Sequence, residues 1–180
     1  MKELTTERLL LRAFVESDWQ AVHEYASDPE VVQYMPWGPN TEEETRRFID
    51  RRLTDQATDH PGHAEYAVVL RAEDRLIGGC GVHASDNPGN YEGWIGYCLN
   101  PRYWCRGYAT EAARAVLGFG FQEFGFHRIF ATCDPRNVGS RRVMEKIGMR
   151  REGRLREHKW QRGEWRDSLL YAILEHEWSG

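Results

Sequence analysis

The stretch of residues 96–112 constrains the fold of this 180-residue chain more than any other part of it. It starts as an apolar strand that ends at Asn100-Pro101, and after a short turn it continues into a long segment with helical periodicity. Arg106 and Gly107 lie in this turn, where the first N–H groups of a helix point outward and carry partial positive charge. Because glycine lets a ligand approach the backbone closely, the turn predicts a binding site for a diphosphate.

The same turn also fits a plainer interpretation, in which Gly107 only ends a loop and the neighbouring arginines are solvated. It lacks the Gly-Lys-Ser/Thr end of a P-loop and the three spaced glycines of a dinucleotide-binding fingerprint. A phosphotransferase that uses a nucleotide is therefore disfavoured.

The alternation of strand-like and helix-like segments predicts a single domain, residues 1–180, of mixed α/β (α+β) class with a central sheet. Seven strands are predicted, at residues 6–14, 64–70, 76–83, 92–99, 128–133, 155–160 and 168–174. Four helices are predicted, at about residues 18–26, 41–57, 109–124 and 138–147. Thr41 and Glu44 form a capping box at the start of the second helix, and residues 85–90 are predicted to form a loop.

Composition and charge disfavour several classes of function. The formal net charge is −4, which argues against nucleic acid as a partner, because such proteins need a basic face. No apolar run is long enough to span a membrane or to act as a signal peptide, so we expect a cytoplasmic protein with no membrane partner. The cysteines, at positions 80, 98, 105 and 133, include no CxxC pair, so we expect reduced thiols and no metal site.

Three further runs accompany the turn: TERLLLR at residues 6–12, NVGSRRVMEKIGM at 137–149 and RGEWRDS at 162–168. Together with GY at residues 96–97, Trp104 and GYATEA at 107–112, they resemble the GNAT superfamily of N-acetyltransferases. The resemblance is strongest to its RimJ/RimL-type group, which includes ribosomal-protein N-terminal acetyltransferases and relatives that act on small amines. It extends over nearly the whole chain.

This resemblance implies a mostly antiparallel sheet that is splayed between its fourth and fifth strands, with acetyl-coenzyme A (acetyl-CoA) in the gap. The fourth strand pairs with the pantetheine arm, the turn holds the pyrophosphate, and Asn137 binds the cofactor near its arm. With the two arginines that add positive charge, the expected cofactor-binding residues are Tyr97, Cys98, Leu99, Arg102, Cys105, Arg106, Gly107, Tyr108, Ala109, Thr110, Asn137 and Ser140. Cys105 departs from the family pattern, in which glycine is more common at this position.

An amine attacks a thioester only in its neutral form, and the usual pKa is about 10.4 for a lysine-like amine and about 8 for an α-amino group. The site therefore needs a base, for which Glu92 is the first candidate and His83 and Glu65 are rivals. Many GNAT enzymes protonate the leaving thiolate with a tyrosine that here is replaced by Met144, so Ser140 is the expected donor. Each residue also has an ordinary structural explanation. Glu92 fits an exposed carboxylate at the end of a strand, and Ser140 fits a hydroxyl that bonds the backbone in the first turn of a helix.

The acceptor pocket is expected to include Tyr34, Trp37, His83 and Asp167, although each of these residues also fits an ordinary structural role. The acceptor itself is left open between the N-terminal amine of a protein and a small-molecule amine. A non-catalytic sensor that binds acyl-CoA is the alternative function, because Met144 cannot donate a proton. The resemblance also allows a homodimer.

Overall fold

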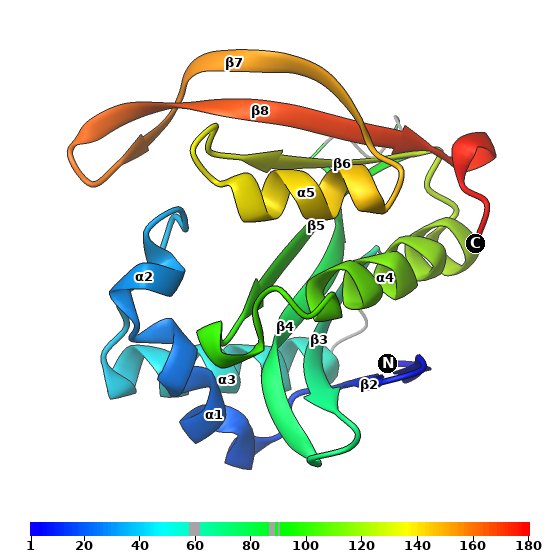
Figure 1. Cartoon of the computed structure of the whole chain (residues 1–180). Coiled ribbons are helices and arrows are strands. Elements are labelled where there is room, and N and C mark those ends of the chain that lie inside the picture. Colours follow the sequence, from blue (N-terminus) through cyan, green and yellow to red (C-terminus); the bar gives the residue numbers. More distant parts are fainter. Residues whose placement is uncertain (58–61, 87–88, 90) are drawn as a thin grey trace.

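The structure, a computed structural model, describes residues 1–57, 62–86, 89 and 91–180. One sheet of eight strands, in the order β1-β2-β3-β4-β5-β6-β8-β7, forms the centre of the molecule (Figure 1). The strands are β1 (Leu4–Thr5), β2 (Leu9–Arg12), β3 (His63–Leu70), β4 (Arg75–Ala84), β5 (Glu92–Leu99), β6 (Arg128–Cys133), β7 (Arg150–Gln161) and β8 (Glu164–Leu174). The helices are α1 (Trp19–Ala26), α2 (Pro29–Val32), α3 (Glu42–Ala57), α4 (Tyr108–Phe124) and α5 (Val138–Lys146). The mixed α/β class is therefore confirmed.

Two short elements were missed by the sequence prediction. Strand β1 precedes the first predicted strand, residues 6–14, of which only Leu9–Arg12 is extended as β2, because residues 6–8 turn between β1 and β2 with a hydrogen bond from Thr6 N to Leu9 O. A fifth helix, α2, begins at Pro29, where the missing N–H of proline costs no hydrogen bond, and Asp28 caps it by accepting from Glu30 N at 2.8 Å. Residues 87, 88 and 90 of the predicted loop lie outside the described part of the chain.

Two apolar clusters cover the two faces of the sheet. Helices α4 and α5 pack on one face, where Tyr66, Leu117 and Met144 are fully buried. Helices α1, α2 and α3 pack on the other, around Phe14 and Ile49. The predicted capping box opens α3 and is confirmed by reciprocal hydrogen bonds between Thr41 and Glu44. Successive residues of a strand therefore face two different helical layers, which decides where each side chain can act.

The sheet opens between β5 and β6, as the resemblance implied for the fourth and fifth predicted strands. These two strands run parallel and pair only from Glu92↔Arg128 to Trp94↔Phe130. Beyond Trp94, β5 remains paired with β4 on its other edge, while β6 follows β8. In Figure 1 the layer of β6, β7 and β8 accordingly diverges from the layer of β3, β4 and β5. One edge of β5 is thus left unpaired over its second half.

The C-terminal hairpin of β7 and β8 reaches across this opening to the loop that follows α2. Arg162, at the tip of the hairpin, donates hydrogen bonds to the carbonyl oxygens of Val32 and Gly38. Arg166 donates to the carbonyl oxygen of Gln33 at 3.0 Å. The two sides of the opening are therefore tied together by segments far apart in the sequence.

Candidate active site

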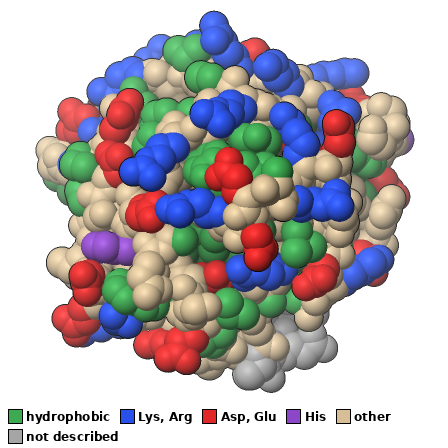
Figure 2. Space-filling view, turned by 60° about the horizontal axis from the view of Figure 1, so that its bottom comes forward, with side chains coloured by type: hydrophobic (Ala, Val, Ile, Leu, Met, Phe, Trp, Pro, Cys, Tyr) green, Lys and Arg blue, Asp and Glu red, His purple; other side chains and the backbone are tan. Residues whose placement is uncertain are grey.

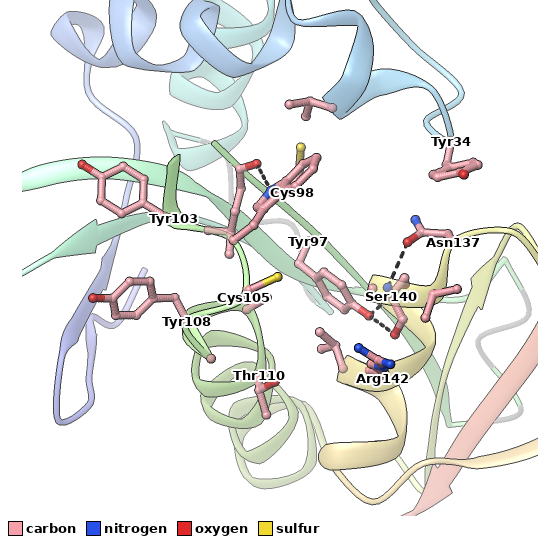
Figure 3. Close-up of a pocket in the computed structure, with 18 of the residues that line it drawn as sticks. Tyr34, Tyr97, Cys98, Tyr103, Cys105, Tyr108, Thr110, Asn137, Ser140 and Arg142 are labelled. Carbon is pink, nitrogen blue, oxygen red and sulfur yellow. Dashed lines mark hydrogen bonds between the residues drawn. The ribbon is translucent and has the colours of Figure 1, made fainter. Parts of the chain in front are cut away.

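A cavity of about 510 Å³ lies where β5 separates from β6. It is bounded by the second half of β5, the turn between β5 and α4, the first two turns of α5, and α2 with the loop after it (Figure 3). The predicted residues that line it are Tyr34, Tyr97, Cys98, Leu99, Cys105, Gly107, Tyr108, Ala109, Thr110, Asn137 and Ser140. The structure thus brings most of the predicted cofactor-binding residues to one place.

The turn that begins α4 leaves several backbone amides available to a ligand. Gly107 is the N-cap residue of α4 in a left-handed conformation (φ 84°), and no side chain caps the helix there. Within the described part of the chain, the N–H groups of Cys105, Arg106 and Gly107 have no acceptor. Cys105 also has a positive φ of 58°, which fits the preference for glycine at this position. The backbone N–H groups of this turn can therefore bind a pyrophosphate.

Positive charge near the cavity comes from α5 rather than from the predicted arginines. Arg102 and Arg106 are exposed and do not line the cavity. Arg142 and Lys146 do line it, together with Gly139 and Val143. The spacing of these residues, i, i+3, i+4 and i+7, is that of one helix face and was the signal available in the sequence.

Arg8 holds the turn from the opposite side. Its guanidinium pairs with Glu111 at 2.6 Å, donates to the carbonyl oxygen of Arg106 at 3.0 Å, and lies 4.6 Å from the ring centroid of Tyr108. Burial alone would raise the pKa of Glu111, but hydrogen bonds from Thr6 and Arg8 hold the pKa below its ordinary value. The run at residues 6–12 therefore supports the turn without lining the cavity itself.

Replacing Arg8 by alanine should weaken acetyl-CoA binding about tenfold, because the turn loses its support, and should lower the free energy of unfolding by about 1 kcal/mol. The lowered pKa of Glu111 means that its stabilising contribution is present above the ordinary pKa of about 4.3 and is lost as the pH falls through the lowered one. The stability difference between Arg8→Ala and wild type should therefore shrink in acid. Urea titrations between pH 3 and pH 7 would measure it. An equal difference across this range, or an equal loss in Arg47→Ala on exposed α3, would contradict the assignment.

A pair of hydroxyl groups faces the cavity from β5 and α5. The Tyr97 hydroxyl lies 3.0 Å from Ser140 Oγ and 3.1 Å from the carbonyl oxygen of Ser140 (Figure 3). Asn137 Oδ1 accepts a hydrogen bond from Ser140 N at 2.9 Å, which caps α5 and fixes Ser140. Burial raises the pKa of Tyr97, so the phenol remains protonated. The sequence assigned only the backbone of Tyr97 to the site and missed its hydroxyl.

Met144 is fully buried in the core beneath α5 and does not line the cavity. A side chain at this position points away from the opening between β5 and β6. The hydrogen-bonded hydroxyls of Tyr97 and Ser140 are thus candidate proton donors in the wall of the cavity.

The structure does not bring Glu92 to this cavity. Glu92 lies at the closed end of the opening, where it pairs with Arg128, which in turn pairs with Glu152. Glu92 does not line the cavity and is already paired with a guanidinium, so the geometry gives no support to a general-base role here.

Three of the residues expected in the acceptor pocket also lie outside the cavity lining. Trp37 is on the loop after α2 and is 38% exposed. Asp167, on β8, accepts a hydrogen bond from Glu157 N and pairs with Arg154 at 2.6 Å, and these contacts lower its pKa. His83 lies on β4 and contacts Glu65 rather than the cavity. Of the four residues, only Tyr34 lines the cavity.

No group of His, Cys, Asp and Glu in the described residues is arranged to hold a metal ion. None of the helices in the described ranges is long and apolar enough to cross a membrane. The face shown in Figure 2 intersperses basic and acidic side chains with exposed apolar ones, rather than presenting one broad patch of a single charge.

The chain matches the family model described as an acetyltransferase (GNAT) domain over residues 8–150. It is 47% identical to the uncharacterized N-acetyltransferase YnaD of Bacillus subtilis (strain 168), over 98% of this chain and 99% of that protein. The crystal structure of a GNAT-family acetyltransferase from Bacillus anthracis superposes with a TM-score of 0.87 at 44% identity, covering 97% of this chain and 99% of that one.

A more distant fold neighbour is described as RimL, a ribosomal L7/L12 alpha-N-protein acetyltransferase in complex with coenzyme A. It superposes with a TM-score of 0.82 at 21% identity, covering 96% of this chain and 98% of that one. The family match and the opening of the sheet between β5 and β6 together identify this chain as a member of the GNAT family of acetyl-CoA-dependent acetyltransferases.

Proposed function

We propose that this enzyme transfers the acetyl group of acetyl-CoA to a primary amine by direct attack of the amine on the thioester. The observation that carries the proposal is the cavity between β5 and β6, with unused amides at one end and paired hydroxyls at its side. The two features match the two parts of the cofactor, an anionic diphosphate and a thioester.

Binding uses the backbone more than the side chains. The amides of residues 105–107 and the first turn of α4 receive the pyrophosphate, with Arg142 and Lys146 nearby to balance its charge. The free edge of Tyr97, Cys98 and Leu99 pairs with the amides of the pantetheine arm, as an added strand would. The thioester then lies in the opening, next to Tyr97 and Ser140.

The amine nitrogen forms a bond to the thioester carbon, and N–H groups on the free edge of β5 stabilise the resulting oxyanion. The carbon–sulfur bond then breaks, the sulfur leaves with the electron pair, and the nitrogen releases its surplus proton to water. The hydrogen-bonded pair of Tyr97 and Ser140 supplies a proton to this thiolate. An acetyl-cysteine intermediate is disfavoured, because burial raises the pKa of Cys98 in the cavity wall to about 12 and keeps it a thiol.

The acceptor enters past α2, where Glu30, Gln33 and Tyr34 form the rim of the cavity. The description of the RimL neighbour as an alpha-N-protein acetyltransferase makes the α-amine of a protein the first acceptor to test. A small amine, such as a polyamine or an aminoglycoside, is the second.

Single-turnover assays with acetyl-CoA would test the proposal. The acceptors are peptides with N-terminal alanine or serine, the same peptides with the α-amine blocked, and spermidine. Release of coenzyme A that depends on a free amine supports the transferase. Tight binding of acetyl-CoA by calorimetry, with no coenzyme A released to any acceptor, would instead favour the sensor module.

A further inference from the structure

Glu65 does not line the cavity, but it lies on β3, two strands away from β5, and no arginine or lysine of the described residues neutralises it. Glu92, Asp167 and Glu111 each pair with a guanidinium. The ionic contact of Glu65 within the described residues is with His83, whose Nε2 lies 2.9 Å from Glu65 Oε2. The side chain of Glu65 is 25% exposed, so a ligand can reach it. Glu65 can therefore receive a cation, unlike these three carboxylates.

A row of glycines separates Glu65 from the opening. Glu65 on β3 is opposite Gly81 on β4, and Gly81 is opposite Gly96 on β5. A Cβ at Gly81 would lie 2.8 Å from His83 Nε2 and would collide with the Glu65 carboxylate, so glycine is required there. Gly96 comes after Trp94, the last residue of β5 that pairs with β6.

The distance across this row suits an amine. Neighbouring strands lie about 4.8 Å apart, so the backbone of Glu65 is about 10 Å from β5, and its side chain covers part of that distance. A Cβ at Gly96 would contact only the ring of Trp94, at 3.5 Å. An acceptor ammonium can thus lie over Gly96, between the carboxylate of Glu65 and a thioester in the opening.

A chain of titratable groups leads from Glu65 to the surface. His83 is 8% exposed, and its ring stacks on Trp94 with 4.4 Å between centroids. His83 Nδ1 lies 3.4 Å from Nδ1 of His63, and His63 is exposed at the start of β3. Both ring nitrogens of His83 therefore face partners, one toward Glu65 and one toward the surface.

The other titratable groups around Glu65 are uncharged at neutral pH. They are Tyr25 from α1, Cys98 from β5 and Cys80 from β4, each near enough to interact electrostatically with Glu65. Burial raises the pKa of all three, so none competes with Glu65 for a proton near pH 7.

We propose that Glu65 is the base that removes the proton from the acceptor ammonium, and that His83 and His63 pass this proton to water. The inference rests on the proposed amine acetyltransferase function. The ammonium loses one proton to the Glu65 carboxylate and becomes a neutral amine. The carboxyl group gives this proton to His83 Nε2 as His83 Nδ1 releases its own proton to His63 Nδ1. His63 then releases a proton from Nε2 to water, and the amine uses its lone pair to attack the thioester. Exchange of ring protons with water restores the starting tautomers of His83 and His63 before the next turnover.

Glu65→Gln keeps the shape of the side chain and removes the base, so kcat/KM for a peptide α-amine should fall about a hundredfold at pH 7. The loss should diminish as the pH rises past the acceptor pKa of about 8, because more of the amine is already neutral. The acetyl-CoA affinity of Glu65→Gln should equal that of wild type. Glu92→Gln, the same change at a carboxylate that already pairs with Arg128, is the matched control and should keep wild-type kcat/KM.

A weakly basic acceptor, an acyl hydrazide, separates proton removal from mere positioning. Because the hydrazide is neutral at pH 7, Glu65→Gln should acetylate it at nearly the wild-type rate. His63→Gln should slow transfer to the peptide amine severalfold and should recover with added imidazole buffer. Glu65→Asp, which keeps the charge and retracts it, serves as a second variant if Glu65→Gln does not fold, and it should lose about tenfold.

The outcomes discriminate between the two proposals. A wild-type enzyme that binds acetyl-CoA but acetylates no amine overturns the proposed function, and the relay with it. An active wild-type enzyme with an equally active Glu65→Gln overturns the relay alone. An equal loss toward peptide amine and hydrazide also overturns it, because Glu65 would then only position the acceptor.

Discussion

Replacing Gly107 by glutamate is expected to weaken the binding of acetyl-CoA about a thousandfold. The new carboxylate would lie beside the diphosphate, and two like charges about 4 Å apart repel each other by about 4 kcal/mol near a protein surface. This penalty corresponds to roughly three orders of magnitude in affinity. The left-handed conformation of Gly107 (φ 84°) adds backbone strain for any other residue. Isothermal titration calorimetry with acetyl-CoA measures the loss directly.

Two control variants separate charge from strain. Gly107→Ala introduces the strain alone and places a Cβ 3.4 Å from Arg8 Nη2, so it should lose about tenfold or less. Gly163→Glu makes the same change at another left-handed glycine (φ 79°), which lies in the hairpin turn with no atom near its Cβ position. Gly163→Glu should bind acetyl-CoA as wild type does. A folded Gly107→Glu enzyme with wild-type affinity would refute the assignment of the turn.

Removing both hydroxyls of the Tyr97 and Ser140 pair is expected to lower kcat about a thousandfold. General acid catalysis contributes about a hundredfold to ten-thousandfold, and the double variant Tyr97→Phe/Ser140→Ala removes both hydroxyls of the hydrogen-bonded pair. Each single variant should lose less than a hundredfold, because the remaining hydroxyl still faces the thiolate. The losses should therefore be strongly non-additive.

Single-turnover kinetics on enzyme saturated with acetyl-CoA would isolate this step from binding. Tyr66→Phe is the matched control, because the buried Tyr66 hydroxyl makes no hydrogen bond within the described residues. It should keep wild-type kcat and should not lower stability. Turnover of the double variant at the wild-type rate would show that water, rather than these hydroxyls, protonates the leaving group.

The long, periodic elements of this fold could be predicted from the sequence. Helix α4 was placed within one residue at its start, because its apolar face and the Gly107 turn are strong local signals. The two-residue strand β1 and the four-residue helix α2 were missed, since both are too short to show periodicity. The opening of the sheet was inferred only through the family resemblance, because pairing between β5 and β6 depends on residues far apart in the chain.

The candidate site also has one part that could be predicted from the sequence and one part that could not. The residues predicted to bind the cofactor form one contiguous run plus the start of α5, so motif and spacing were sufficient to bring most of them to one cavity. Its acid–base residues could not be chosen, because a carboxylate is available only if no cation pairs with it. Whether Glu92 meets Arg128, and whether Glu65 faces His83, is decided by strand register. Similarly, the Tyr97 hydroxyl became relevant only when α5 placed Ser140 beside it.

The short pairing between β5 and β6 has a consequence for how the enzyme holds together. Only three residue pairs join the strands on the β4 side to those on the β8 side, apart from helices and loops. In the binding mode proposed above, a pantetheine arm hydrogen-bonded along β5 fills the remaining length of the seam and contacts α5 beyond it. Bound substrate thereby replaces missing backbone pairing, so the amides of residues 96–99 should exchange with deuterium more slowly in its presence.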